Sequence, residues 1–436
     1  MQAVLLCAGK STRIAPLVDK VLLKIAGKTV LEHQIENLTK IGLRDFVIVA
    51  NAENLLTIQN LCQKLQTKVS RFQFTIQEDF NLGIYGALKK ASPLVEEDCL
   101  VINSNDFVEN SLYEDLFKIS QSKAYKAIVC GKVVHKYFPG GYISLDSHHC
   151  FKDVVEKPGE GNEPSNLVNI LIHYIQNLAE LVEIGENCEI PKNNNDIYQS
   201  CLQIIAQDSP ILVHAYNGFW QAIKYPWHIL HIQSYLLKKL DHFIHPQAEI
   251  SPHAIIRGKV YIEEGVKVLE NAIIVGPCFI GKNSVIANHT LIRESNIGER
   301  CVIGFSTEIT RSWLEKDIWT HFNYIGDSLI GEKVTFGAGA IIGNLRFDEQ
   351  NIHTHIKGEK VNTQIKKLGA MIGSETRIGI NATINPGIKI GKKCFIGGGV
   401  AIQKDIPDNS LVYHDFQPII KENKNTFTPS ENDLNI

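Results

Sequence analysis

Aliphatic side chains recur at every sixth position through much of the C-terminal half of the chain. A helix would space apolar residues by three and four and a half-buried strand by two, so a six-residue step fits neither element. One aliphatic residue per hexapeptide indicates instead a short strand on one side of a triangular coil. The pattern therefore predicts a stiff, stacked prism with these side chains pointing inward. The phased positions are Ile250, Ile256, Ile262, Val268, Ile274, Ile280, Ile286, Ile292, then Ile330, Phe336, Ile342, and finally Ile372, Ile378, Ile384, Ile390, Ile396 and Ile402.

The six-residue period stops between residues 344 and 367, the largest break in the repeat. Segments that leave a rigid scaffold often carry function. His353 and His355 lie in this break, but no third ligand stands nearby to complete a metal site, and a solvated loop is the simpler interpretation. Trp313 and Trp319, which precede the break, are expected to pack against or cover the prism, because aromatic burial is the usual role of tryptophan.

The N-terminal half alternates short apolar runs with helical periodicity. Such alternation predicts a parallel sheet covered by helices on both faces. A last helix is expected to open at Pro226, a residue suited to a first helical turn, and to carry Trp227, Ile229, Leu230, Ile232 and Leu236 inward. The other predicted helices are 30–41, 55–65 and 197–206, and the predicted strands are 3–6, 46–49, 72–76, 99–102, 128–134 and 167–172.

The length of the chain agrees with a division into separate folding units. Its 436 residues predict two or three domains, at roughly 150 residues each. The last helical pattern ends at about Leu240, and the six-residue period begins soon afterwards. We therefore predict an α/β domain at 1–241 and an all-β domain at 242–414. Residues 415–436 are predicted to be a C-terminal tail, because the polar stretch from about 421 has few core-forming residues.

Charge and cysteine content narrow the class of protein. Lys and Arg number 44 against 47 Asp and Glu, and the net charge of −3 gives no reason to expect a nucleic acid or an anionic membrane as partner. The ten cysteines are scattered without paired metal spacing, which indicates reduced thiols in a cytoplasmic protein. No run approaches the ~20 apolar residues of a membrane span. Small-molecule substrates are therefore expected.

The first predicted strand ends in a turn that carries convergent cations. Gly9 follows the strand, and Arg13 and Lys20 come soon after it. Exposed backbone amides together with these two side chains can hold phosphate groups. Any strand-to-helix turn can also carry a glycine and surface cations, so this segment alone leaves an ordinary turn as the alternative.

The order of motifs in the first half resembles the sugar-1-phosphate nucleotidylyltransferase superfamily. The family's opening glycine, threonine and arginine, followed by lysine, match Gly9, Thr12, Arg13 and Lys20. The resemblance implies a Rossmann-like domain in which a sugar-1-phosphate attacks the α-phosphate of a nucleoside triphosphate and releases pyrophosphate. Arg13 and Lys20 would then offset developing negative charge. The resemblance also implies nucleotide binding at Gly9, Gln77 and Gly83, sugar binding at Gly141, Glu156 and Asn169, and Mg²⁺ at Asp106.

Several positions in this half depart from the family pattern. Ser11 replaces the second loop glycine, and Asp19 replaces the proline that usually precedes the lysine. After Gly83, the pair Ile84-Tyr85 replaces two small residues, which predicts an altered base pocket.

The metal site has a departure of its own. Ala222 stands where relatives often place a second metal-binding aspartate. Magnesium can be held by one carboxylate with water and phosphate oxygens, so we expect a working but divergent site. Asp106 has a structural alternative, because the polar run 103–106 also suits a turn or cap.

The prism resembles the left-handed parallel β-helix of hexapeptide-repeat acyltransferases. A histidine motif at 320–327 narrows the likeness to bifunctional enzymes that join such a domain to a nucleotidylyltransferase. An amine must lose its proton to attack a thioester, and a histidine suits that role at neutral pH, so His321 is the candidate general base. The likeness further implies a homotrimer, with Tyr324 and Asn344 orienting the amino sugar and acetyl-CoA lying along Ala338, Ser374 and Gly398.

Three functions of different classes are compatible with these features. The favoured one is a cytoplasmic bifunctional transferase that uses a sugar-1-phosphate, a nucleoside triphosphate and acetyl-CoA to make an activated amino sugar for the cell envelope. The second is an acetyltransferase with a degenerate nucleotidyltransferase domain, which Tyr85 and Ala222 favour. The third is a non-catalytic assembly or regulatory protein, against which His321 and its motif argue.

Overall fold

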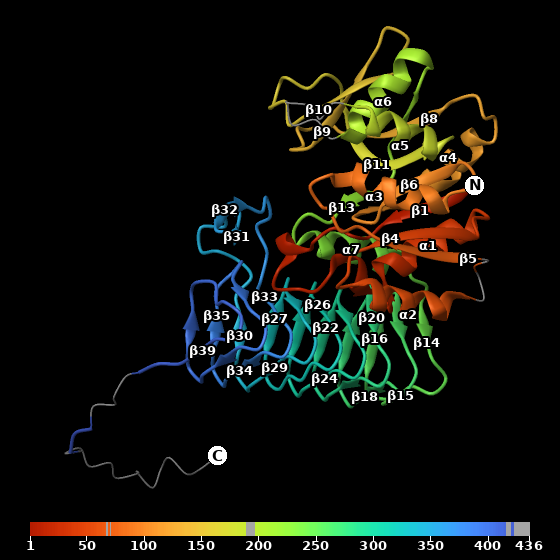
Figure 1. Cartoon of the computed structure of the whole chain (residues 1–436). Helices are drawn as coiled ribbons and strands as arrows, with labels where there is room; N and C mark the ends of the chain where they lie inside the picture. The colour runs from red at the N-terminus through yellow and green to blue at the C-terminus, as the bar shows by residue number, and fades with distance from the viewer. Residues whose placement is uncertain (67–68, 70, 189–196, 416–419, 423–436) are drawn as a thin grey trace.

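The computed structural model describes residues 1–66, 69, 71–188, 197–415 and 420–422. An α/β domain stands on one side of a β-helix (Figure 1). Of the predicted tail, residues 416–419 and 423–436 lie outside the described residues. Among the residues that are described, no helix combines the length and the apolar character needed to cross a membrane.

The α/β domain is built on a nine-stranded mixed sheet, with strands β1 (Gln2–Leu6), β4 (Asp45–Ala50), β5 (Arg71–Ile76), β6 (Cys99–Asn103), β8 (Ala127–Val133), β9 (Gly141–Leu145), β10 (Phe151–Glu156), β11 (Leu167–Ile175) and β12 (Leu212–Tyr216). The strands β6, β1, β4 and β5 are adjacent and parallel, as the alternation predicts. The predicted parallel arrangement does not extend to β11, which runs antiparallel to β6, β8 and β9. Since β9, β10 and β11 follow one another with no helix between them, the chain returns directly, which favours antiparallel pairing.

Helices cover both faces of this sheet, as predicted. On one face lie α1 (Val30–Lys40), α2 (Leu55–Leu65) and α4 (Asn110–Ser120), and on the other α3 (Gly83–Ala91), α5 (Leu178–Glu186) and α6 (Ile197–Asp208). The last helix, α7 (His228–Lys239), begins two residues after Pro226 rather than at it. It buries Ile229 and Ile232 as predicted, but Leu237 is buried more completely than Leu236.

Three stacked faces close the C-terminal half into a prism (Figure 1). Every phased position from Ile262 to Ile402 is at most 4% exposed, so the predicted inward row is confirmed. The first face holds β14 (Phe243–Ile244), β17 (Val260–Ile262), β20 (Cys278–Ile280), β23 (Asn296–Ile297), β26 (Trp313–Leu314), β28 (Leu329–Ile330), β33 (Met371–Ile372) and β36 (Lys389–Ile390). The second holds β15 (Glu249–Ile250), β18 (Lys267–Val268), β21 (Val285–Ile286) and β24 (Val302–Ile303), then β29 (Thr335–Phe336), β34 (Arg377–Ile378), β37 (Phe395–Ile396) and β39 (Leu411–Val412). The third holds β16 (Ile255–Arg257), β19 (Ile273–Val275), β22 (Leu291–Arg293), β25 (Glu308–Thr310), β27 (Tyr324–Gly326), β30 (Ile341–Ile342), β35 (Thr383–Ile384) and β38 (Ala401–Ile402).

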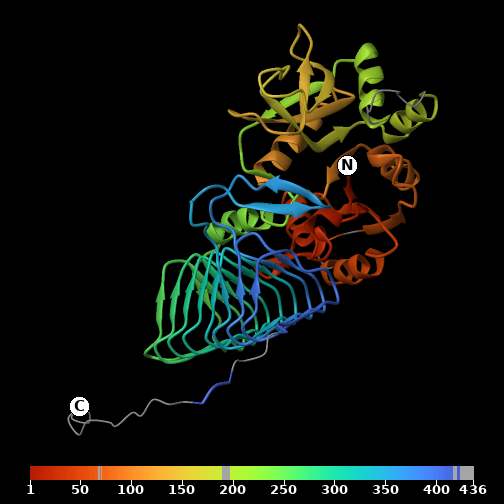
Figure 2. The same ribbon diagram turned by 90° about the vertical axis from the view of Figure 1, so that its left-hand side faces the viewer.

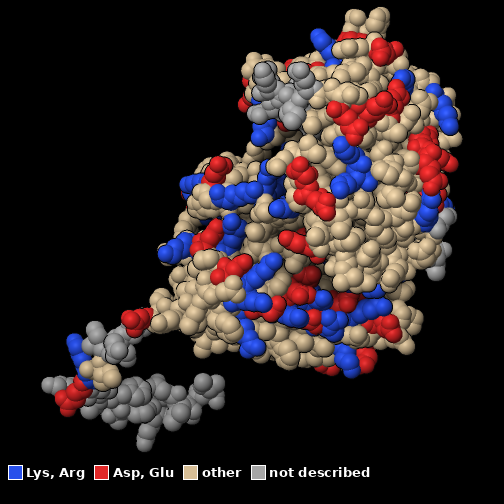
Figure 3. Space-filling model, in the orientation of Figure 1, with Lys and Arg blue, Asp and Glu red and all other residues tan. Residues whose placement is uncertain are grey.

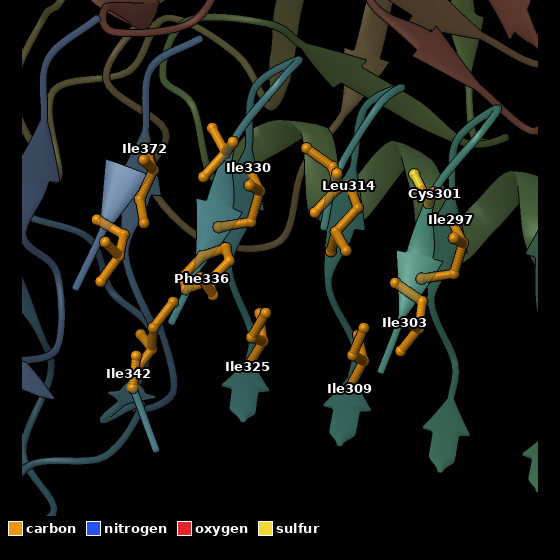
Figure 4. Packing of buried hydrophobic residues seen from close by; sticks show 14 of the residues in the cluster. Ile297, Cys301, Ile303, Ile309, Leu314, Ile325, Ile330, Phe336, Ile342 and Ile372 are labelled. Carbon is orange, nitrogen blue, oxygen red and sulfur yellow. The ribbon is translucent and has the colours of Figure 1, made fainter. Parts of the chain in front are cut away.

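The prism continues without interruption through the stretch where the sequence period drifts. Ile262 pairs with Ile280, Ile280 with Ile297, Ile297 with Leu314, and Leu314 with Ile330, so successive coils span 18, 17, 17 and 16 residues. Figure 4 shows Ile297, Leu314 and Ile330 still stacked in the interior. The shorter coils have one or two residues fewer than 18 but keep the inward-facing positions. Their apolar residues are therefore not always six apart, and a strict six-residue count missed these coils.

The break in the repeat contains a β-hairpin, β31 (His353–Ile356) and β32 (Glu359–Asn362). His353 and His355 are exposed as expected, but they lie on a strand rather than in a loop. Figure 2 shows this light-blue hairpin crossing from the prism toward the red N-terminal segments.

A shared hydrophobic core joins the prism to the α/β domain. Trp313 is fully buried in it, as predicted, and its Nε1 donates a hydrogen bond to the Lys24 carbonyl oxygen at 2.7 Å. Ile14 and Phe107 reach the same core from segments that flank Arg13 and Asp106. Contact with the prism therefore supports both segments. Trp319, in contrast, is 52% exposed.

Candidate active sites

A cavity of about 760 Å³ in the α/β domain receives the side chains predicted for phosphate, metal and sugar. It lies where the turn after β1, strand β7 (Asp106–Val108) and the ends of β9, β10 and β11 meet. Six cations against two carboxylates give the lining a formal excess of four positive charges, which suits a ligand with several phosphates. The predicted residues are Arg13, Lys20, Asp106, Gly141, Glu156 and Asn169, and the further cations are Lys10, Lys157, Lys224 and Lys357.

A second cavity of about 360 Å³ adjoins the first and holds the three residues predicted for the nucleotide, Gly9, Gln77 and Gly83. The two cavities share lining residues, including Lys10 and Asn105. Gln77 is buried, and its Nε2 donates to the carbonyl oxygens of Gly83 at 2.7 Å and Asp79 at 3.2 Å. These two bonds fix the amide and leave its oxygen as an acceptor for a ligand.

Two substitutions relative to the family pattern compensate for each other in the turn after β1, which we call the signature turn (residues 9–20). The Ser11 hydroxyl donates to Asp19 Oδ1 at 3.0 Å and accepts from the Lys20 amide at 3.2 Å. Asp19 Oδ2 also accepts from Asn54 Nδ2 at 2.6 Å, which ties the turn to the start of α2. The residues that replace a glycine and a proline of the family pattern therefore hold the loop together.

Lys20 faces the residues predicted to bind the nucleotide and the metal. A Cβ built on Gly9 would lie 4.0 Å from Lys20 Nζ, so the lysine head sits over the glycine turn. Burial lowers the pKa of Lys20, while Asp19 and Asp106 oppose that shift. A phosphate would provide a further negative partner for this partly buried ammonium.

Asp106 is buried at the start of β7 and is held on both carboxylate oxygens. Trp220 Nε1 donates to Oδ1 at 2.9 Å, and Asn103 Nδ2 approaches Oδ2 at 3.3 Å. Burial raises the pKa of Asp106, and the Trp220 hydrogen bond and Lys224 oppose the shift. One donor on each oxygen leaves further acceptor capacity, and Asp106 lines the cavity, so the aspartate remains able to ligate a cation.

The donor set around Asp106 fits a magnesium ion that takes most of its ligands from substrate. Ala222 is the cross-strand partner of Asp106 in the pair β7 and β13 (Trp220–Ala222), so a second carboxylate is missing directly opposite. Among the described residues, no group of three or more His, Cys, Asp or Glu side chains could hold a metal. One carboxylate with phosphate oxygens and water is nevertheless a common magnesium environment.

Lys224, two residues after Ala222, lines the same cavity. Its ammonium lies 4.7 Å from the centre of the Phe138 ring and 3.4 Å from the Pro139 carbonyl oxygen. Burial lowers the pKa of Lys224, and Asp106 and Glu156 oppose the shift. A fixed cation therefore stands near the residues predicted to contact metal and sugar.

The sugar end of the cavity is shaped by a close approach of β9 and β10. A Cβ on Gly141 would lie 2.7 Å from Glu156 Oε1, so only glycine leaves room for that carboxylate. Asn169 on β11 accepts a hydrogen bond at Oδ1 from His173 Nε2 at 3.1 Å, and His173 Nδ1 accepts from the Tyr198 hydroxyl at 2.7 Å. The neutral imidazole thus orients the amide of Asn169 and leaves its NH₂ group for a ligand.

Acid should destabilise the protein through His173. Burial lowers its pKa to about 3, whereas an unfolded histidine titrates near 6.5. The unfolded state therefore binds one more proton between these values, and this stability, complete above pH 6.5, falls by roughly 1.4 kcal/mol per pH unit as the pH drops toward 3. Urea unfolding of His173→Gln at pH 6.5 and 4.5 should show a shallower pH dependence than the parent, and the exposed control His253→Gln should not. Equal slopes for the two variants would contradict this assignment.

Tyr85 does not alter the base pocket, contrary to the sequence prediction. It is 3% exposed, and its hydroxyl donates to the Val182 carbonyl oxygen at 3.0 Å. Its ring lies so close to Gly185 of α5 that a Cβ there would come within 2.1 Å. Tyr85 is therefore a packing residue between α3 and α5. Ile84, in contrast, lines both cavities.

His321 is exposed and lines an open cavity of about 430 Å³ on the prism. Trp319, Arg377 and Phe395 line the same cavity. The backbone around the histidine is fixed, because its amide donates to Asn323 Oδ1 at 2.7 Å and its carbonyl oxygen accepts from the Thr307 hydroxyl. A rigid loop therefore presents an accessible imidazole beside apolar rings and one guanidinium.

Tyr324 and Asn344 contact each other on the third face of the prism. Asn344 Nδ2 donates to the Tyr324 hydroxyl at 3.1 Å and to Asp327 Oδ2 at 2.6 Å. Arg311 holds the same aspartate through two hydrogen bonds of 2.7 and 2.8 Å. Burial raises the pKa of Tyr324. The predicted amino-sugar residues thus form one polar network that is braced by an ion pair.

The turns at one corner of the prism stack on one another in successive coils, and this corner column contains His321. Two of the three residues predicted for acetyl-CoA lie in it. Backbone hydrogen bonds of 2.8 to 2.9 Å link the column through Phe322 to Gly339, Ala338 to Asn381, and Ile380 to Gly399. Ala338 and Gly398 are exposed along it. Ser374 is 7% exposed and belongs to a different corner, where its carbonyl oxygen accepts from the Lys393 amide. The structure therefore does not bring Ser374 to the His321 cavity.

The residues of the first cavity that were not predicted from the sequence include Gln199, Trp220, Lys224 and Lys357. Trp220 and Lys224 flank Ala222, so a search around the missing aspartate could have found them. Gln199 comes from α6 and Lys357 from the β-helix, and nothing in their local sequence indicates a contact with the first domain.

The chain is similar to known proteins over nearly its whole length. Residues 2–224 match the nucleotidyl transferase family, residues 239–361 the GMPPB C-terminal domain, and residues 369–404 six bacterial transferase hexapeptide repeats. A bifunctional sugar-1-phosphate nucleotidylyltransferase/acetyltransferase of Sulfurisphaera tokodaii is 31% identical over 416 residues, which cover 93% of this chain and 98% of the relative. The bifunctional protein GlmU of Methanocaldococcus jannaschii is 30% identical, covering 95% and 97%, and that of Methanococcus vannielii is 32% identical, covering 97% and 100%.

Proposed function

Because the chain belongs to the family of bifunctional sugar-1-phosphate nucleotidylyltransferase/acetyltransferases, we propose that it performs both transfers at the two sites described above. One site would join a nucleoside triphosphate to a sugar-1-phosphate. The other would acetylate the nitrogen of an amino-sugar phosphate with acetyl-CoA. The observation that carries the proposal is the single cavity in which Arg13, Lys20, Asp106 and Glu156 meet.

Nucleotidylyl transfer requires control of negative charge rather than a covalent nucleophile. The sugar-phosphate oxygen attacks the α-phosphate, and pyrophosphate leaves. Lys20 and Arg13 would hold the phosphates in line and stabilise the charge that develops on them. Gln77 would fix the base, while Glu156 and Asn169 would fix the sugar. Bound at Asp106, Mg²⁺ would neutralise phosphate charge.

Acetyl transfer would use His321 as the proton acceptor. The amino-sugar nitrogen attacks the thioester carbonyl, a C–N bond forms, the C–S bond breaks, and coenzyme A leaves as the thiol. His321 would remove the proton from the attacking nitrogen and supply one to the departing sulfur. Tyr324 and Asn344 would orient the amino sugar, and backbone amides in the corner column with Ala338 and Gly398 would line the coenzyme groove.

A homotrimer of prisms is part of the proposal. Large apolar side chains stand exposed on the prism near the His321 cavity, including Phe322 at 61%, Ile380 at 60% and Phe395 at 52%. Apolar side chains that cluster on a surface favour association with another protein surface. A neighbouring prism would cover them and close the open side of the cavity. We place the enzyme in the cytoplasm, where nucleoside triphosphates and acetyl-CoA are available.

The geometry of the first site argues against the alternative of a degenerate nucleotidyltransferase domain. Tyr85 packs away from the base pocket, and Ser11 with Asp19 stabilises the signature turn. Ala222 still leaves the cavity without the second carboxylate that relatives often have. This absence predicts weaker magnesium binding rather than loss of the reaction.

A mass-spectrometric screen would test both reactions together. The full chain is incubated with Mg²⁺, acetyl-CoA, each of four nucleoside triphosphates and a panel of sugar and amino-sugar phosphates. We expect a product with the mass of a nucleotide sugar and one with the mass of an added acetyl group, each lost when its own co-substrate is omitted. Acetylation without any nucleotide sugar would instead support the degenerate domain, and the absence of both products would refute the proposal.

A further inference from the structure

The β-helix contributes a residue to the cavity of the other domain. Lys357 lies at the tip of the β31 to β32 hairpin, inside the break in the hexapeptide repeat. It nevertheless lines the first cavity of the α/β domain, here called the nucleotidylyl cavity, together with Arg13 and Lys224. Figure 2 shows the hairpin crossing from the prism toward the N-terminal segments. Residues of one chain from both halves therefore form a single site.

The hairpin is held in place at its base and at its underside. Its base is closed by hydrogen bonds between Ile352 and Ile365 at 2.9 Å and between Thr363 and Ile352 at 3.0 Å. Ile352 and Ile356 are buried in the shared core with Ile14, next to Arg13. The hairpin and the signature turn thus pack on common side chains, which fixes the position of one relative to the other.

The turn at the tip is compact and directs a cation outward. Lys357 and Gly358 have φ values of 53° and 84°, the combination required at the two central positions of a tight hairpin turn. Glycine adopts this conformation without strain, whereas lysine does so at some cost. The turn therefore has few alternative conformations, and its lysine enters the cavity from a short, stiff support.

Charge at this edge indicates the kind of ligand. The space-filling view shows several Lys and Arg side chains, with Asp and Glu among them, where the hairpin meets the α/β domain (Figure 3). The cavity already has four more cations than carboxylates, and Lys357 is one of those cations. An ammonium added to such a lining is stabilised when phosphate groups occupy the cavity.

We infer that Lys357 binds a phosphate group of the nucleotidylyl reaction, so that the β-helix completes the active site of the α/β domain within one chain. The inference rests on the proposed nucleotidylyl transfer. The phosphate belongs either to the sugar-1-phosphate or to the nucleoside triphosphate, and kinetics can separate these two sources.

Binding of inorganic pyrophosphate gives a direct test. In calorimetry on the full chain with Mg²⁺, Lys357→Gln should weaken pyrophosphate binding by about tenfold, the loss expected for one charged hydrogen bond. Lys357→Arg should retain most of the affinity. Lys360→Gln is the matched control, because Lys360 is exposed on β32 of the same hairpin but does not line the cavity. It should bind pyrophosphate like the parent.

Steady-state kinetics would then identify the phosphate. A rise in KM for the sugar-1-phosphate alone in Lys357→Gln assigns the contact to that substrate, and a rise for the nucleoside triphosphate alone assigns it to the triphosphate. Acetyl transfer should be unchanged in either case.

Two results would overturn the inference: an equal loss of pyrophosphate affinity in Lys357→Gln and Lys360→Gln, or a Lys357→Gln variant that matches the parent both in pyrophosphate affinity and in the KM for each substrate. Failure of the proposed function is distinguishable, because pyrophosphate binding requires no turnover. If the parent makes a nucleotide sugar and Lys357→Gln matches it in pyrophosphate affinity and in both KM values, the proposed function is retained and only this inference is lost.

Discussion

Replacing His321 by alanine should lower the rate of acetyl transfer by roughly 10²- to 10⁴-fold, the usual contribution of a positioned general base. The imidazole is exposed in an open cavity on a backbone that is fixed by Asn323. Its removal should therefore leave the prism and its stability almost unchanged. Release of the coenzyme A thiol with an amino-sugar phosphate measures the effect.

Two comparisons make the His321 result specific. His253 is exposed on an early part of the prism, so His253→Ala should acetylate at the parent rate. Nucleotidylyl transfer by His321→Ala should also match the parent, because the histidine lies on the prism, outside the lining of both nucleotidylyl cavities. Thiol release that persists undiminished in His321→Ala would remove this residue from the mechanism.

Asp106→Asn should reduce nucleotidylyl transfer by roughly 10²- to 10³-fold. The amide can still accept the Trp220 hydrogen bond, so the local fold should persist while the negative charge is lost. Because Ala222 leaves no second carboxylate opposite, Asp106 is the one acidic side chain of this strand pair that can hold Mg²⁺. Pyrophosphate release, measured with the substrates found in the screen, gives the effect.

The magnesium dependence of the same variant distinguishes ligation from a capping role. If Asp106 holds the ion, Asp106→Asn should require a higher Mg²⁺ concentration for half-maximal rate. Asp115→Asn is the matched control, since Asp115 lies on α4 with a half-exposed side chain near His214. A variant that lost stability but kept the parent's magnesium dependence would show that Asp106 serves the turn instead.

Most of the predicted nucleotidylyl residues meet in the structure because they lie at the ends of neighbouring strands. Gly9 follows β1, Asp106 follows β6, and Asn169 belongs to β11, and these three strands are adjacent in the sheet. The carboxyl ends of the parallel strands β1 and β6 share one edge, and the antiparallel β11 brings its N-terminal part, with Asn169, to that same edge. Ser374 lacked such a constraint: a hexapeptide repeat offers three equivalent corners, and the motif does not specify which one faces His321.

The departures show where pattern reading is weakest. Ser11 and Asp19 each differ from the family pattern, but they are hydrogen-bonded to each other. Tyr85 differs as well, yet Gly185 on another helix makes room for its ring. In each case the residue that compensates for the substitution either lies far away in the sequence or cannot be recognised as a partner from the sequence alone. Judging the effect of a substitution therefore required its neighbours in space.

The period of the aliphatic residues was enough to predict the prism. Each side of a coil needs one inward-facing apolar side chain, so such residues recur about every six positions in the sequence. The alternation of strands and helices likewise determined a layered α/β domain, although not the antiparallel direction of β11. Only the tertiary structure decided that the hairpin in the repeat reaches the first domain, so that Lys357 and Arg13 line the same cavity. The physical reason is that the hairpin and the first domain are held by a shared core to which Ile14 and Ile356 both belong. Burial of apolar surface is favourable however far apart the residues lie in the sequence.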